Sequence, residues 1–236
     1  HEDGYWIKIS GETELEVEGL PTDPATLYSL HDGSNLVSYP FSGHAFVEET
    51  IPEDAQESFI GIMGEGESAM NTENGWIGGL LELSGTKGYW FITSEAVDFT
   101  YNPPAEGTSR MVSHIRAVPL EYSFKQSTQQ AFFFVENATI GRETLETEDL
   151  IIAYNGDIII GARYWYGEIT DVPAMGIDKD PKYDGYGKSG DQITFKVLDA
   201  STNSLVDMDA EGVTIWKNFG MTVVQLIDKV IPEQIS

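Results

Sequence analysis

One acidic loop, Gly176–Asp191 with the sequence GIDKDPKYDGYGKSGD, has carboxylates at spacings that could hold a metal ion. The expected ligands are Asp178, Asp180, Asp184 and Asp191. Carboxylate oxygens at alternating loop positions, with a glycine at the tight turn, are what Ca²⁺ requires. An EF-hand would need an oxygen ligand at Lys182 and a glutamate at Ser189, so that motif is excluded. We therefore predict a looser Ca²⁺ site, and the alternative is an acidic turn exposed to solvent.

Aromatic side chains follow one another in the segment Arg163–Gly167, RYWYG. Successive side chains of a strand point to opposite faces, so Tyr164 and Tyr166 share one face and Trp165 lies on the other. An exposed tyrosine face could stack on a sugar ring, which predicts a ligand-binding site at these two tyrosines. In the alternative, Trp165 is buried and the tyrosines form cross-strand pairs. The remaining tryptophans are expected in the core, namely Trp6, Trp76, Trp90 and Trp216.

Catalytic motifs fail on spacing or on charge. The segment Gly66–Met70, GESAM, lacks the G-x-S-x-G pattern of a nucleophile elbow. The overlapping MGEGES lacks the lysine of a phosphate-binding loop, and Glu65 and Glu67 would repel a phosphate. No pair among the 39 acidic residues stands out as the two carboxylates of a glycosidase. The chain has no cysteine and four scattered histidines, which excludes thiolate ligands and disfavours zinc. We predict that the protein is not an enzyme.

The net charge of −26, from 13 Lys and Arg against 39 Asp and Glu, limits the possible partners. Such a negative field repels nucleic acid and anionic membranes, and it favours solubility at high ionic strength. No apolar run approaches the ~20 residues that cross a bilayer. We therefore predict no nucleic-acid partner, no membrane insertion and an extracellular or cell-surface location.

The elements that must position these residues are strands. Short apolar segments rich in β-branched and aromatic residues alternate with glycine and proline, which is typical of strands. Asn155-Gly156, between LIIAY and DIIIGARYW, is the strongest hairpin signal. Only Ala45–Phe59 has helical character, with Pro52 at a first turn or a break. We predict an all-β fold of two β-sandwich-like modules in tandem, with an extra N-terminal β-hairpin and one or two short helices.

The phrase GYWIKIS at Gly4–Ser10 recurs as GYWFITS at Gly88–Ser94. Repetition at a fixed offset is a sign of tandem modules. The match continues beyond the phrase, with apolar Leu15 and Val17 at the positions of Phe99 and Tyr101. A lone hairpin is marginal in water, so this segment needs a partner sheet, in a neighbouring module or at the edge of another copy. Pairing with another copy would build a fibre or a surface layer through Tyr5, Trp6, Ile7 and Ile9.

A linker divides the rest of the chain. The segment Tyr101–Arg110 contains paired prolines, Gly, Ser and Thr and has no apolar period. The expected domains are a terminal hairpin of an upstream repeat module at 1–21, a β-rich repeat module at 22–105, a linker at 106–120 and a β-sandwich-like module at 121–236.

Both modules resemble parts of secreted bacterial surface proteins. The stretches LHDGSNLVSYPF, GIMGEGESAM, GWIGGL and GTKGYWFI resemble a recurrent surface module. The stretches FKQSTQQAFFFVENATI, DLIIAYNGDIIIGARYW, DVPAMGID and GDQITFKVLDA are similar to its frequent companion in marine and Bacteroidota-type bacteria. The final stretch, WKNFGMTVVQLIDKVIPEQIS, is similar to the passage before the sorting domain of such proteins, but the usual YPNPFNP is absent. Members often have cysteines near the equivalents of Ile159 and Ile169, where this chain has none.

The resemblance implies export by type IX secretion and brings no assigned chemistry with it. We expect a secreted, non-catalytic structural or adhesive surface protein, with self-association or neighbouring modules as its partners. One alternative is a carbohydrate-binding module of a cell-surface protein, with a glycan at Tyr164 and Tyr166. Another is a virion surface protein of a marine phage, which fits the same β architecture and acidity.

Overall fold

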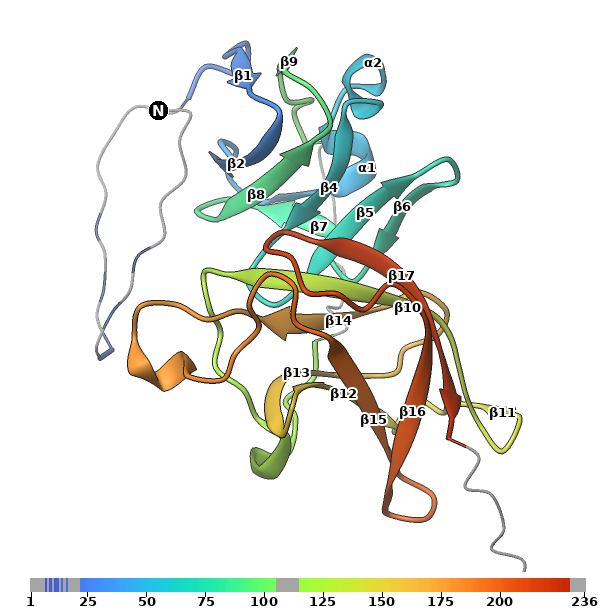
Figure 1. Ribbon diagram of the computed structural model, residues 1–236. Coiled ribbons are helices and arrows are strands. Elements are labelled where there is room, and N and C mark those ends of the chain that lie inside the picture. Colours follow the sequence, from blue (N-terminus) through green and yellow to red (C-terminus); the bar gives the residue numbers. More distant parts are fainter. Residues whose placement is uncertain are drawn as a thin grey trace, which may run out of the picture. The chain divides into compact units, whose positions relative to one another are not determined.

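The computed structural model describes residues 7, 9, 11, 12, 14, 16, 22–104 and 115–229. The chain forms two compact units, His1–Ser113 and His114–Ser236, called the first and the second unit below. Strands dominate both units, which confirms the all-β prediction (Figure 1). Two short helices, α1 (Val47–Thr50) and α2 (Glu53–Gln56), lie within the segment expected to be helical. None of the described helices has the length and hydropathy of a transmembrane segment.

The first unit contains one five-stranded sheet and two strand pairs, all antiparallel. The large sheet has the order β2-β8-β4-β5-β6, and the pairs are β1-β9 and β3-β7. The strands are β1 (Tyr28–Leu30), β2 (Gly33–Ser38), β3 (His44–Phe46), β4 (Phe59–Met63), β5 (Ser68–Thr72), β6 (Gly75–Gly78), β7 (Glu82–Ser84), β8 (Gly88–Thr93) and β9 (Val97–Phe99).

Strand β8 carries the second copy of the repeated phrase and lies between β2 and β4. The register places Val37 opposite Tyr89 and Ile62 opposite Phe91, and all four side chains are buried. Trp90, which points to the other face of the sheet, is half-buried. The repeated phrase is thus the sequence of an interior strand that directs two aromatic side chains into the core.

Aromatic rings fill the core that Phe91 faces. The Phe91 ring centroid lies 5.6 Å from that of Phe59 and 6.0 Å from that of Phe99. Tyr101 completes the cluster, with its centroid 4.9 Å from both Phe99 and Tyr28. The contacts of Phe59 and Tyr101 are edge-to-face, the arrangement that the charge distribution of aromatic rings favours. These rings join the large sheet to the β1-β9 pair.

Two buried tyrosine hydroxyls of the first unit have different surroundings. Burial raises the pKa of both Tyr39 and Tyr89 to about 12. The Tyr89 hydroxyl accepts a hydrogen bond from the backbone N–H of Ser84, at 2.8 Å. Within the described residues the buried Tyr39 hydroxyl has no hydrogen-bond partner. Of the two hydroxyls, that of Tyr89 therefore takes part in a hydrogen bond that stabilises the fold, and that of Tyr39 does not among the residues described.

The second unit is built on one eight-stranded sheet of order β11-β10-β17-β16-β15-β12-β13, with β14 paired to β10. Strands β10 and β17 are parallel and the other pairs are antiparallel. The elements are the 3₁₀ turns η1 (Leu120–Tyr122) and η2 (Pro181–Tyr183) and the strands β10 (Gln130–Ile140), β11 (Glu143–Thr144), β12 (Leu150–Asn155), β13 (Ile158–Tyr164), β14 (Thr170–Met175), β15 (Ile193–Asp199), β16 (Ser204–Gly212) and β17 (Met221–Asp228).

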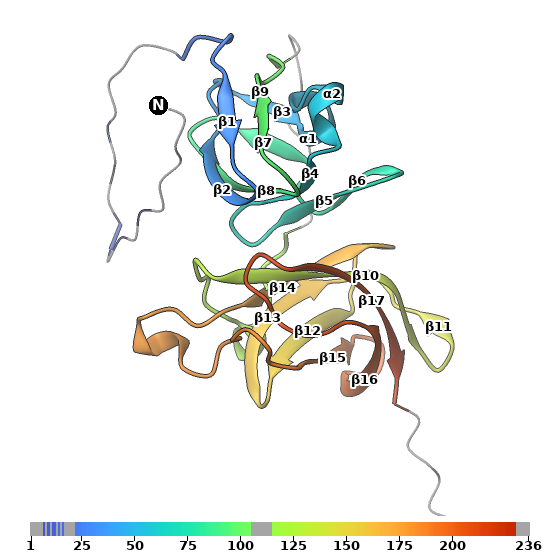
Figure 2. The ribbon, with the colours of Figure 1, turned by 45° about the horizontal axis from the view of Figure 1, so that its top comes forward.

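This sheet curls into a half-barrel, so that strands distant in the sheet face each other (Figure 2). The rings of Phe133 on β10 and Phe195 on β15 meet across the core at 5.3 Å. At the open side, β13 approaches β14 so closely that a Cβ on Gly161 would lie 1.6 Å from the Pro173 carbonyl oxygen. Only glycine fits that contact. The two halves of the curled sheet therefore enclose a common core, as the layers of a sandwich do.

The segment that precedes β10 covers the outer face of the half-barrel. Val118 and Tyr122 pack against a second cluster that includes Leu150 and Ile152 of β12. Arg116 donates a hydrogen bond to the Thr147 carbonyl oxygen at 2.8 Å. The last part of the expected linker 106–120 therefore packs on the second unit.

A buried ion pair joins the end of β13 to the start of β14. Arg163 Nε donates to the Asp171 carbonyl oxygen at 2.9 Å, and its guanidinium lies 3.4 Å from the Asp171 carboxylate. The Tyr166 hydroxyl donates to Asp171 Oδ1 at 2.9 Å. Burial and the adjacent Asp171 charge raise the Tyr166 pKa above its usual value, so this hydroxyl stays protonated. The pair holds its charges away from water with hydrogen bonds on both partners.

Removing the two buried hydroxyls of the first unit should have different effects. Tyr39→Phe deletes a group without a partner, so we expect the free energy of unfolding to stay equal or to rise by up to about 1 kcal/mol. Tyr89→Phe leaves the Ser84 N–H without its acceptor and should lower that free energy by about 1–3 kcal/mol. Urea unfolding of the two variants measures both values. A larger loss in Tyr39→Phe than in Tyr89→Phe would contradict this assignment.

The buried ion pair of the second unit can be compared with an exposed one. Asp171→Asn weakens the compensation of a buried guanidinium and should lower the free energy of unfolding by about 3 kcal/mol. Asp207→Asn removes the exposed pair with Lys196, at 2.9 Å, and should cost no more than about 1 kcal/mol. Equal losses in chemical denaturation would show that the buried pair has no special weight.

Candidate functional site

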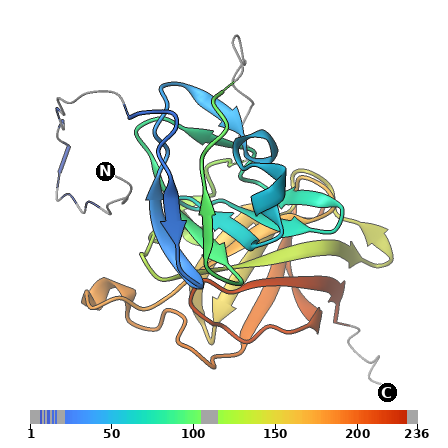
Figure 3. The same cartoon turned by 90° about the horizontal axis from the view of Figure 1, so that it is seen from above.

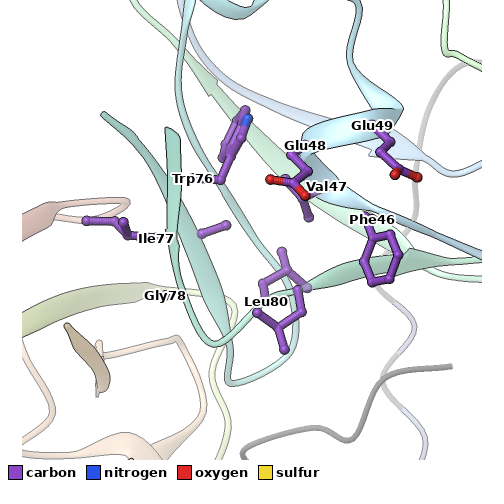
Figure 4. Close-up of a pocket in the computed structure, with 10 residues that line it drawn as sticks. Phe46, Val47, Glu48, Glu49, Trp76, Ile77, Gly78 and Leu80 are labelled. Carbon is purple, nitrogen blue, oxygen red and sulfur yellow. The ribbon is translucent and has the colours of Figure 1, made fainter. Parts of the chain in front are cut away.

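A pocket of about 350 Å³ in the first unit lies between α1 and the β5-β6 hairpin (Figure 4). Figure 3 shows α1 and α2 as two short light-blue turns that follow each other in the chain. The pocket lining combines apolar side chains, one indole ring and two carboxylates. The lining residues are Phe46, Val47, Glu48, Glu49, Ala69, Trp76, Ile77, Gly78, Leu80 and Leu81.

Hydrogen bonds to backbone groups of α1 fix the carboxylate side of the pocket. The Val47 N–H donates to the Leu81 carbonyl oxygen at 3.0 Å, which ties the start of α1 to the chain entering β7. Asn102 Nδ2 donates to the Glu49 carbonyl oxygen at 2.9 Å, and Gln56 Nε2 donates to that of Glu48 at 3.2 Å. The backbone of both glutamates is therefore held in place, and their side chains are exposed.

The aromatic side of the pocket belongs to β6. Trp76 lies opposite Asn71 in the β5-β6 hairpin, and it packs against the core of the first unit. Asn71 Nδ2 fixes that hairpin by donating to the carbonyl oxygens of Gln56, at 2.8 Å, and Phe59, at 3.1 Å. Figure 4 shows Trp76 and Glu48 next to the same space, with Leu80 below them.

The first unit is strongly negative around this pocket. Residues 22–104 carry 13 Asp and Glu side chains and a single Lys or Arg side chain, Lys87. In the described part of the chain, no ion pair or side-chain hydrogen bond involves the carboxylates of Glu48 or Glu49. The pocket therefore offers apolar surface, an aromatic ring and two hydrogen-bond acceptors that carry negative charge.

Three of the four aspartates of the predicted Ca²⁺ loop accept hydrogen bonds from other groups of the second unit. Asp180 caps η2 by accepting from the Lys182 N–H at 3.1 Å, and Asp178 accepts from the Lys179 N–H. Asp191 accepts from Asn155 Nδ2 and from the Lys188 N–H, both at 2.9 Å. Asp184 follows η2 and is exposed. Over 22–104 and 115–229, no three His, Cys, Asp or Glu side chains form a group that could hold a metal ion, and Ca²⁺ binding stays a prediction.

The aromatic pair of the second unit is engaged within the protein. Trp165 is buried in the core of the half-barrel, as the alternative expected. Tyr164 is half-buried, and the Arg116 guanidinium carbon lies 4.1 Å from its ring centroid. Tyr166 is half-buried and its hydroxyl is bonded to Asp171. Both tyrosines thus make contacts within the second unit, and glycan binding at Tyr164 and Tyr166 stays a prediction.

The predicted assembly strand falls mostly outside the described residues. Tyr5 and Trp6 lie outside the described residues. Ile7 and Ile9 are described, and both are exposed. The role of the four residues in assembly stays a prediction.

Sequence reasoning did not identify the pocket residues as a site. Trp76 was expected in the core, whereas it is half-buried and contributes to the pocket lining. Trp216 is buried, and its Nε1 donates to the Ala174 carbonyl oxygen at 2.9 Å. The useful signal was the pair Glu48-Glu49 in the short helical segment, but only the tertiary fold brings that pair to Trp76.

No family model, curated protein or solved structure matches this chain.

Proposed function

We propose that this chain is a non-catalytic structural or adhesive protein of the cell exterior, built from repeating β-units that associate through strand addition. One observation carries the proposal: the repeated phrase is the sequence of β8, the interior strand of the first unit. A segment with the apolar alternation of an interior strand is marginal on its own and needs a sheet that receives it. Residues 4–10 match residues 88–94 at four of seven positions, Gly, Tyr, Trp and the final Ser.

The buried positions of the described copy support this proposal. Tyr89, Phe91, Phe99 and Tyr101 are buried in the first unit. The matching residues of the N-terminal copy are all apolar, namely Tyr5, Ile7, Leu15 and Val17. The repetition therefore preserves four of the six buried positions of β8 and the segment after it, while Lys8 and Ile9 stand at the positions of buried Ile92 and Thr93. That pattern is of use only where a further sheet receives the segment.

The five-stranded sheet provides two positions for an added strand. Its end strands are β2 and β6, each paired on one side within the described residues. Extended segments add to such edges through backbone hydrogen bonds, with alternate side chains giving specificity. The charge of −26 and the resemblance to secreted surface modules support a location outside the cell.

Assembly is the test of this function. We expect sedimentation velocity of the full chain to show species larger than the 26.1 kDa chain at high concentration. Amides of residues 4–18 should then exchange more slowly with solvent as concentration rises, because backbone pairing protects them. The double variant Ile7→Ser, Ile9→Ser should abolish both effects.

A matched control is Glu14→Ser, Glu16→Ser, which changes two polar side chains of the same segment and should preserve assembly. A wild-type chain that stays monomeric, with rapid exchange over residues 4–18 at every concentration, contradicts the proposal.

A further inference from the structure

We propose that the pocket between α1 and β6 binds an ammonium or guanidinium group carried on an apolar stem. Such a group is the side chain of a lysine or an arginine, or the end of a free aliphatic amine. The inference goes beyond the proposed function and does not depend on it, since binding of a single cationic side chain requires no strand added to β6. Three properties of the pocket support this proposal: its charge, the chemistry of its lining and its size.

Charge selects a cation. Glu48 and Glu49 line the pocket from α1, and both side chains are exposed. Lys87 is the single Lys or Arg of 22–104, and it does not line the pocket. A cation entering here meets two carboxylates and a negative surrounding field, and charge-assisted hydrogen bonds are about twice as strong as neutral ones.

The lining selects an apolar stem behind the cationic group. Phe46, Val47 and Leu80 contribute apolar surface, and Trp76 contributes an indole ring. An indole face attracts a cation within about 6 Å of its centroid, and tryptophan does so more strongly than other aromatic residues. The methylene stems of lysine and arginine pack on apolar surface while the charged end remains at a polar position. The apolar and aromatic lining thus suits the stem of such a side chain, and the carboxylates of Glu48 and Glu49 suit its charged end.

Size favours a single side chain over an oligosaccharide. The cavity of about 350 Å³ lies near the lower end of the ~300–1,000 Å³ range of small-ligand pockets. The charged groups of its lining are acceptors alone, whereas hydroxyl-rich sugars present donors and acceptors together. A ligand that only donates and carries positive charge therefore fits this pocket better.

Calorimetric titration of the full chain at low salt tests the proposal. The probe is Nα-acetyl-lysine N-methylamide, and its matched neutral control is Nα-acetyl-norleucine N-methylamide, which keeps the stem without the ammonium. We expect the lysine probe to bind at least about tenfold more tightly, which corresponds to one charge-assisted interaction. The affinity should fall as salt is added, because the pocket glutamates are exposed.

A second comparison assigns the binding to the pocket. Glu48→Gln, Glu49→Gln should weaken binding of the lysine probe about tenfold or more. Glu53→Gln, Glu57→Gln removes the same charge from exposed residues outside the pocket, and it should change the affinity less than about twofold. In nitrogen-labelled protein, the indole N–H signal of Trp76 should shift on titration, and that of Trp216 should not.

The source of the cation is decided by a third arm with cadaverine, a free diamine. Preference for the lysine probe identifies a protein side chain, and preference for cadaverine identifies a free amine; both outcomes support the site. Equal binding of the norleucine control overturns the proposal, and so does an equal loss in the two double-glutamine variants. Binding of cellotetraose without binding of the lysine probe would also overturn it, in favour of a glycan.

Discussion

The first unit depends on the packing of β8 between β2 and β4. This interior strand pairs on both edges and directs Tyr89 and Phe91 into a core of aromatic rings. The same core holds the β1-β9 pair through Phe99 and fixes the segment that follows β9 through Tyr101. The pocket also depends on this arrangement, because β8 pairs with β4, β4 with β5, and β5 with β6, the strand that contains Trp76.

The second unit is constrained in a different way, by a close backbone approach. Gly161 lets β13 touch β14, and the ion pair of Arg163 and Asp171 holds the same two strands at their adjoining ends. Each of these two buried charges would be unfavourable without the other. The pair therefore holds the start of β14 next to the end of β13. Trp165 and Tyr166 take their places from this junction. The segment expected to bind sugar thus serves as part of the scaffold.

Local patterns predicted the elements, while the site required tertiary information. The composition of the apolar segments predicted an all-β chain, and the Asn155-Gly156 turn between β12 and β13 follows from local chemistry alone. Strand alternation placed Trp165 opposite the tyrosines, but it could not reveal that Arg116 covers Tyr164. The pocket escaped prediction because Glu48 of α1 and Trp76 of β6 are brought together by tertiary contacts, such as the hydrogen bond from the Val47 N–H to the Leu81 carbonyl oxygen, that no local pattern encodes.

Native-state amide hydrogen exchange over residues 22–104 tests the central role of β8 most directly. The amides of Tyr89–Ile92 should exchange only through global unfolding of the first unit, with the highest free energy of opening in that unit. Those of the end strand β6, Trp76–Gly78, should exchange through local opening at a lower free energy. If β8 opens locally while β6 remains protected, the first unit is held by another part of the fold and this account is wrong.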